Sequence, residues 1–80
     1  MEIKILGTGC PNCQRLEKNT REALAMMGVE AQITKVTQMK DIMAYNILST
    51  PGLVINEKVV ASGRVPMPAE IGSMIASALV

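Results

Sequence analysis

The apolar and polar positions of the chain repeat with different periods, and each period predicts a kind of element. Glu2–Leu6 is a short apolar run, which is typical of a central strand covered on both faces. Over residues 14–27 the apolar positions recur every three or four residues, which predicts an amphipathic helix, and Gly28 is suited to end it. Residues 29–36 alternate between apolar and polar side chains, so we expect a half-exposed edge strand there.

The middle of the chain predicts a second, shorter helix. Thr37 is suited to the N-cap of a helix over residues 38–45, and Asn46 is suited to the left-handed position that ends it. The side chains expected to face inward in this helix are Met39, Ile42 and Met43. Their spacing indicates that these methionines pack in the core rather than bind a soft metal.

A hairpin and a closing helix complete the pattern. Residues 53–55 and 58–62 are strongly β-forming, and Asn56-Glu57 between them predicts a turn, although glycine is favoured after asparagine in a tight turn. Pro68 is suited to the first position of a last helix. The apolar stripe of that helix consists of Ile71, Met74, Ile75, Ala78 and Leu79.

The predicted order is β-α-β-α-β-β-α, which places the chain in the α/β class. The first two strands are joined through a helix, so we expect them to be parallel with a right-handed crossover, whereas the last two form an antiparallel hairpin. The result is a four-stranded mixed sheet with helices on both faces. We expect one domain over residues 1–80, because a chain of 80 residues lies near the small end of what folds alone.

The composition of the chain excludes several classes of function. The chain is 49% hydrophobic and 19% charged, with no phenylalanine or tryptophan, so its core must be aliphatic, with seven methionines to fill gaps. The net charge is +1 and the basic residues are scattered, so neither a nucleic-acid patch nor an aromatic stacking platform is indicated. Lys4 and the glycines after Leu6 interrupt the first apolar run, so we expect neither a signal peptide nor a membrane span, and we expect a cytoplasmic protein.

The two cysteines of the chain, Cys10 and Cys13, form a CxxC motif at the first strand-to-helix junction. Such a motif is typical of reversible dithiol–disulfide exchange. Pro11 takes the first helical position, which leaves Cys10 at the N-cap, close to unpaired backbone N–H groups at the positive helix end. Lowering a cysteine pKa from about 8.5 to about 7 requires roughly 2 kcal/mol, which these groups can supply together.

We therefore predict that Cys10 is the attacking nucleophile and that Cys13, buried inside the first turn, is the resolving thiol. Two unreactive buried cysteines and half of a zinc site are alternatives, but structural zinc wants four ligands and the chain has no histidine. A Cu(I) ion remains an alternative because it needs only two thiolates. Lys4 has two interpretations: a lysine that extends to the edge of the sheet, which we favour, or a cation that stabilises the Cys10 thiolate.

The chain resembles the small archaeal and bacterial glutaredoxin-like thioredoxins, also called the redox-active disulfide protein 2 family. The resemblance extends over essentially all 80 residues and is carried by residues 5–13 (ILGTGCPNC), 49–56 (STPGLVIN) and 59–66 (VVASGRVP). It implies a minimal thioredoxin fold in which Pro51 is cis and faces the cysteines. It also implies that the substrate lies against Thr50, Pro51, Pro11 and Gly9, with the backbone of Thr50 free to pair with it.

The resemblance also implies an activity and its partners. We expect a thiol–disulfide oxidoreductase that acts as a monomer in cell redox homeostasis, needs no cofactor or metal, and is re-reduced by a thioredoxin-reductase-like flavoprotein. Typical glutaredoxins hold the glutathione amine with an acidic residue after the hairpin, but residues 61–64 (ASGR) contain none, so a protein disulfide is the expected substrate. A non-catalytic adaptor and a Cu(I) carrier of the heavy-metal-associated type are the rival interpretations. The latter domains run β-α-β-β-α-β and end on a strand, whereas this chain is predicted to end on a helix.

Overall fold

The computed structural model describes residues 1–79 and contains the predicted order of elements, β-α-β-α-β-β-α. The elements are β1 (Glu2–Leu6), α1 (Pro11–Met27), β2 (Gln32–Val36), α2 (Met39–Met43), β3 (Gly52–Ile55), β4 (Lys58–Ser62) and α3 (Pro68–Ala78). None of the helices in this part of the chain is both long enough and apolar enough to cross a membrane.

The four strands form one mixed sheet in the order β2-β1-β3-β4. β1 pairs with β2 in parallel and with β3 antiparallel, and β3 and β4 form the hairpin. β1 and β3 are therefore the central strands, and every residue of β3 is buried. The α/β class, the mixed sheet and the edge position of β2 are confirmed.

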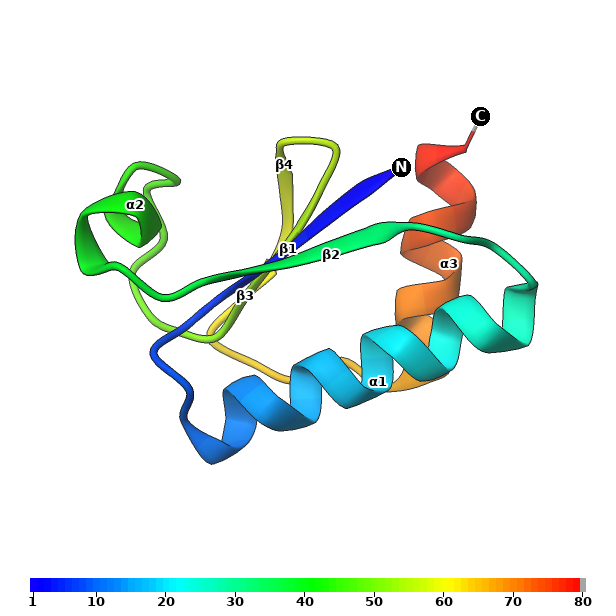
Figure 1. The fold of residues 1–80 in the computed structure, drawn as a ribbon, viewed down its shortest axis with the longest axis horizontal. Coiled ribbons are helices and arrows are strands. Elements are labelled where there is room, and N and C mark those ends of the chain that lie inside the picture. Colours follow the sequence, from blue (N-terminus) through cyan, green and yellow to red (C-terminus); the bar gives the residue numbers. More distant parts are fainter. Residues whose placement is uncertain (80) are drawn as a thin grey trace.

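Apolar side chains cover both faces of the sheet. On one face the central strands pack against α1 and α3, and the buried side chains are Ile3, Ile5, Leu16, Ala23, Leu24, Leu53, Ile55, Ala61, Ile71 and Ile75. On the other face a smaller cluster forms around Leu6, Ile42 and Val54, which α2 helps to cover. In Figure 1, α2 accordingly lies apart from α1 and α3. This arrangement leaves the loop between β1 and α1 at one end of the sheet.

The hairpin turn shows why glutamate is tolerated where glycine is favoured. Asn56 and Glu57 have φ angles of 50° and 68°, so both are left-handed. The Glu57 carboxylate accepts hydrogen bonds from the Lys4 ammonium (2.6 Å) and the Tyr45 hydroxyl (3.1 Å). These bonds tie the turn to β1 and to the segment after α2, and they offset the conformational cost at Glu57.

Three details of the sequence prediction were wrong. β2 begins at Gln32, three residues later than predicted, although Val29 and Ala31 still pack against the main cluster. α2 has only five residues, and its N-cap is Gln38, without a side-chain cap bond, instead of Thr37. A helix this short turns only one narrow face toward the sheet, and Ile42 occupies that face.

The expected inward packing of several apolar side chains was also wrong. Met39 and Met43 are 59% and 65% exposed, so they lie on the surface of α2 and not in the core. Leu79 follows the end of α3 and is 56% exposed, whereas Ile71 and Ile75 of the same predicted stripe are fully buried. Methionines at helical spacing therefore did not indicate burial in this short helix.

Candidate redox site

The N-terminus of α1 holds the two cysteines as the sequence predicts. Cys10 is the N-cap, with an extended backbone (φ −66°, ψ 163°), and Pro11 is the first helical residue. The backbone N–H of Cys13 donates a hydrogen bond to Sγ of Cys10 at 3.2 Å. Because α1 has no acidic residue in its first turn, the positive end of its dipole acts on this sulfur without a competing carboxylate in that turn.

Cys10 and Cys13 are joined by a disulfide, with their Cα atoms 5.0 Å apart. Their surroundings differ. Cys13 is 5% exposed and belongs to the buried face of α1, whereas Cys10 is partly exposed at the end of the helix. An external disulfide can therefore approach Cys10 more readily than Cys13.

Gly7 belongs to the site although the sequence analysis assigned it no role. It is buried directly after β1, and its N–H donates to the carbonyl of Val36 at 3.0 Å. A Cβ atom at Gly7 would fall on Sγ of Cys13. The signal in the sequence is a glycine at the point where a buried strand meets the CxxC loop, but only the folded geometry shows which atom needs the space.

The Thr50–Pro51 segment lies at the same end of the sheet as the cysteine loop. Gly52, the first residue of β3, pairs with Leu6, the last residue of β1. The Thr50–Pro51 peptide bond is cis, as the resemblance implies, and the Pro51 carbonyl accepts a hydrogen bond from Gly63 N–H at 2.8 Å. Thr50 is exposed and Pro51 is buried. The register thus brings the end of β1, where the cysteine loop begins, next to the segment expected to contact substrate.

Two further predicted contact residues lie on the cysteine loop itself. Gly9 is exposed and has a φ of 94°, and a Cβ there would meet no atom within 4 Å. Pro11 is exposed at the first turn of α1. The residues directly before and after Cys10 are therefore both exposed.

A hollow of about 230 Å³ lies beside Cys13. Its lining residues are Ile5, Gly7, Gly9, Cys13, Gln14, Glu17, Lys35 and Thr37. Glu17 bonds Lys35 (Oε1–Nζ 3.4 Å) and Arg21 (Oε2–Nη2 2.9 Å). The pKa of Glu17 is lowered, mainly by the hydrogen bond from Arg21 and also by Lys35, so Glu17 is ionised at neutral pH.

Lys4 does not serve the site as the second interpretation proposed. Its ammonium bonds the Tyr45 hydroxyl (2.9 Å) and the Glu57 carboxylate (2.6 Å), on the side of the sheet that α2 covers. The same contacts raise the pKa of Lys4, and the hydrogen bond with Glu57 contributes most to this rise. The interpretation as a lysine that extends to the edge is therefore the correct one, and the notion of a cation beside Cys10 is wrong for this residue.

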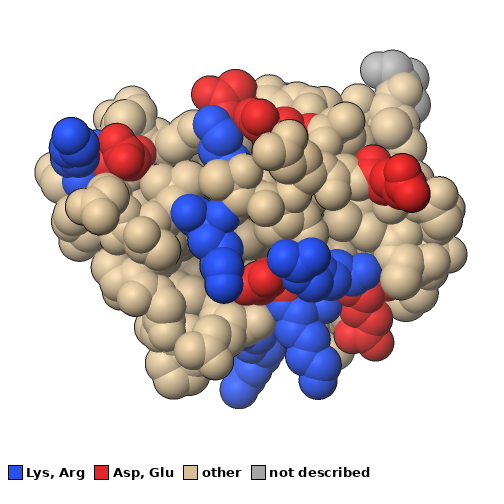
Figure 2. All heavy atoms as spheres, in the orientation of Figure 1, with Lys and Arg blue, Asp and Glu red and all other residues tan. Residues whose placement is uncertain are grey.

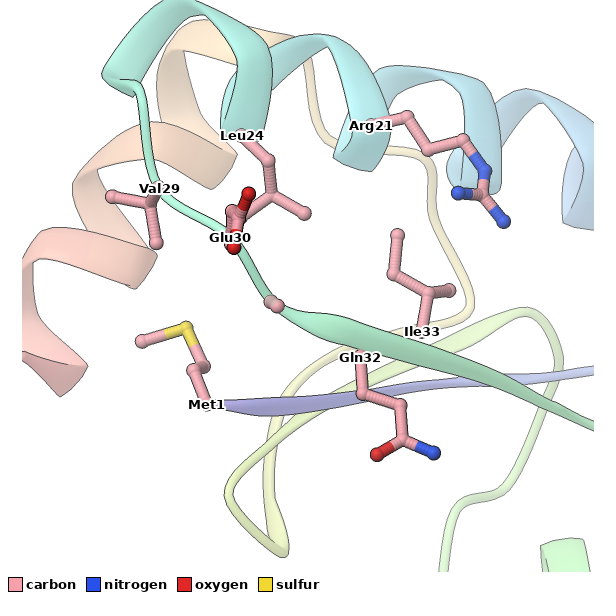
Figure 3. A pocket seen from close by; sticks show the side chains of 8 residues that line it. Met1, Arg21, Leu24, Val29, Glu30, Gln32 and Ile33 are labelled. Carbon is pink, nitrogen blue, oxygen red and sulfur yellow. The ribbon is translucent and has the colours of Figure 1, made fainter.

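A more open hollow lies between the C-terminal half of α1 and the segment that leads into β2 (Figure 3). Its lining residues are Met1, Arg21, Leu24, Val29, Glu30, Ala31, Gln32 and Ile33. Most of them belong to the main apolar cluster or pack against it, so this hollow is the margin of the core. Within residues 1–79, no three His, Cys, Asp or Glu side chains gather closely enough to hold a metal ion.

Comparison with known proteins agrees with this geometry. Residues 1–76 match the family described as Thioredoxin domain. The chain is 40% identical over 75 residues to a thioredoxin of Methanothermobacter thermautotrophicus, a match covering 94% of this chain and 97% of that one. It is 35% identical over 77 residues to a thioredoxin of Methanocaldococcus jannaschii, covering 96% and 88% of the two chains. These matches, together with the bonded CxxC pair and the order of the elements, show that the chain belongs to the thioredoxin family.

Proposed function

We propose that the protein is a thiol–disulfide oxidoreductase that reduces protein disulfides, with Cys10 as the nucleophile and Cys13 as the resolving thiol. The observation that carries this proposal is the hydrogen bond from Cys13 N–H to Cys10 Sγ at the positive end of α1. In the reduced protein the same donor and the helix dipole favour the Cys10 thiolate, which is the reactive form. The burial of Cys13 supports its assignment as the second thiol.

The reaction has two exchange steps. The Cys10 thiolate attacks one sulfur of the substrate disulfide, and the other substrate sulfur leaves as a thiolate that takes up a proton. Cys13 then loses its proton and attacks Cys10, which releases the second substrate sulfur and forms the Cys10–Cys13 disulfide. Two electrons pass from the protein to the substrate. A dithiol donor must return them, and a thioredoxin-reductase-like flavoprotein fits that role.

The surface beside Thr50 supports a polypeptide substrate rather than glutathione. A hollow that ends at Thr50 is lined by Met39, Ile42, Met43, Ile47, Leu48, Ser49 and Thr50. None of these residues is charged, and Leu48 is fully exposed. An extended substrate segment next to the substrate disulfide can pair with the Thr50 backbone and place an apolar side chain against the flexible methionines. Gly9 and Pro11 can contact the same segment from the cysteine loop.

The test is insulin reduction with dithiothreitol as the electron donor. We expect the protein to accelerate the reduction and Cys10→Ser to abolish the acceleration. In Cys13→Ser we expect a stable mixed disulfide between Cys10 and the substrate, which an adaptor without catalytic chemistry would not form. No acceleration by the parent protein would contradict the proposal.

A Cu(I) titration of the reduced protein separates the rival function. The oxidoreductase proposal requires exchange activity to be independent of copper, whereas a carrier of the heavy-metal-associated type would bind one Cu(I) tightly through both thiolates. Tight binding together with no insulin reduction would favour the carrier.

A further inference from the structure

Lys4 lies on the face of the sheet that α2 covers only in part. Its side chain is on the same face of β1 as Leu6, which belongs to the same buried cluster as Ile42 of α2. Because α2 has only five residues, it leaves a hollow of about 460 Å³ at Lys4. The lining residues of this hollow are Lys4, Thr34, Val36, Asp41, Ala44, Tyr45 and Glu57. Polar side chains therefore connect the elements here, where the apolar packing ends.

Tyr45 joins the hollow from the end of α2. Its hydroxyl accepts a hydrogen bond from the Lys4 ammonium (2.9 Å) and donates one to the Glu57 carboxylate (3.1 Å). Lys4 also bonds Glu57 directly at 2.6 Å, so the three side chains form a closed set, the Lys4–Tyr45–Glu57 triangle. In Figure 2, basic side chains accordingly lie against acidic ones over the β3–β4 hairpin. Since Lys4 is in a central strand and Glu57 in the hairpin turn, the triangle ties Tyr45 to the sheet.

The segment that follows Tyr45 has few other attachments. Within the described part of the chain, residues 47–50 make no backbone–backbone hydrogen bond, and the next such bond is the one that the Pro51 carbonyl accepts at 2.8 Å. Ile47 packs against the smaller apolar cluster, whereas the three residues after it are exposed. The segment is therefore held by Tyr45 and Ile47 at its start and by Pro51 at its end.

We propose that Tyr45 is a positioning residue, which through the triangle holds residues 47–50 in the arrangement that binds a polypeptide substrate. This segment contains Thr50, whose backbone is expected to pair with the substrate, and it lines part of the apolar hollow beside Thr50. Substrate binds only those molecules in which the segment is so arranged, and the apparent affinity falls in proportion when that fraction falls. The inference rests on the proposed oxidoreductase function and assigns Tyr45 no contact with the reacting sulfurs.

Tyr45→Phe removes the hydroxyl and keeps the ring that packs against the smaller apolar cluster. Without the hydroxyl the segment loses its tie to the sheet, so we expect the KM for insulin to rise about threefold with kcat little changed. Reduction of dithiobis(nitrobenzoate), a small aromatic disulfide that does not need this surface, should keep its rate. A variant that merely contained less folded protein would lose both activities to the same extent.

Backbone motion provides a second readout. NMR order parameters of the N–H groups of residues 47–50 report how tightly the segment is held, on a scale where a rigid backbone gives about 0.85 and a flexible one less than about 0.6. We expect Tyr45→Phe to lower the order parameters of these residues and to leave those of β1 and α1 unchanged.

Two further variants show whether the triangle is the cause. Thr34→Val removes another hydroxyl that lines the same hollow but takes no part in the bonds of the triangle, so it should change neither readout. In a Lys4→Met background, Tyr45→Phe should raise the KM for insulin by less than it does in the parent. The reason is that one of the two hydrogen bonds of the hydroxyl is already absent there.

The inference requires both a higher KM for insulin and lower order parameters in Tyr45→Phe, and the absence of either would overturn it. An equal effect of Thr34→Val, or an equal loss of activity toward insulin and the small disulfide in Tyr45→Phe, would overturn it as well. Absence of insulin reduction by the parent protein would instead overturn the proposed function, and this inference with it.

Discussion

Cys10 and Cys13 are three residues apart and chemically alike, and the fold makes them different. Cys10 receives a backbone N–H at the helix end and is partly exposed, whereas Cys13 is buried beside Gly7 and the Glu17–Lys35 pair. The sequence predicts both the N-cap position of Cys10, from a strand, a CxxC and a proline, and the burial of Cys13 inside the first turn. The residues that surround Cys13 come from other parts of the chain, so these contacts could not be predicted.

Gly7→Ala tests how tightly the site is built around Cys13. The new Cβ would fall on Sγ of Cys13, so the cysteine or the loop must move. We expect the free energy of unfolding of the oxidised protein to fall by about 1–3 kcal/mol, the usual cost of overpacking, and insulin reduction to slow. Urea unfolding measures the first quantity.

Gly72→Ala is the matched control for Gly7→Ala. A Cβ at Gly72 in α3 would be 3.7 Å from Sδ of Met27, which is an ordinary contact. Because alanine is a better helix former than glycine, we expect no loss of stability and a gain of up to about 1 kcal/mol. Equal stabilities of the two variants would show that the space at Gly7 is not needed.

At the scale of elements, sequence periodicity predicts long segments better than short ones. α1 and α3 begin at Pro11 and Pro68 as expected, because proline suits the first position of a helix. Their apolar stripes continue over several turns, so the buried face of each could be predicted. α2 has too few turns for its period to define a face, so the exposure of Met39 and Met43 could not be predicted. The pairing of Lys35 with Glu17 joins two elements and has no local signal apart from the broken alternation of β2.

The exposed side of α2 and the loop after it yield a prediction about substrate choice. We expect Met43→Gln combined with Leu48→Ser to raise the KM for insulin about fivefold, because these substitutions remove apolar surface beside Thr50. Reduction of a small aromatic disulfide should be unchanged.

Met26→Gln is the control for this pair of substitutions. Met26 is 69% exposed on α1 and does not line that hollow. We therefore expect Met26→Gln to change neither the KM for insulin nor the reduction of the small aromatic disulfide. A rise in KM for both substrates, or for neither, in the double variant would contradict a polypeptide-binding role of this surface.

At the scale of the whole molecule, ion pairs on the surface make the stability of the fold depend on pH. Glu57 bonds Lys4, Glu70 bonds Arg64, and the pKa of each glutamate is lowered by its partner. A lowered pKa in the folded state means that the unfolded state binds protons first on acidification. This contribution to stability is present above the ordinary pKa of 4.5 and is lost as pH falls through the lower folded values.

We therefore expect Tm to fall as pH is lowered below about 4.5 and the fall to be smaller in Glu57→Gln, which has lost one of the linked protons. Thermal unfolding followed by circular dichroism at a series of pH values measures Tm for both proteins. Glu22→Gln removes an exposed carboxylate that has no ion-pair partner within residues 1–79, and it should leave the pH dependence unchanged. A flat Tm between neutral and acidic pH in the parent would contradict the role of these pairs.

The most direct test of the account is the order in which the reduced cysteines react. Limiting iodoacetamide is added to the reduced protein near neutral pH, and the labelled sites are found by mass spectrometry. Trypsin leaves both cysteines in the peptide of residues 5–15, so fragment masses must separate them. If Cys10 is the thiolate at the end of α1, it is labelled first and Cys13 remains unmodified; preferential labelling of Cys13 would contradict the assignment.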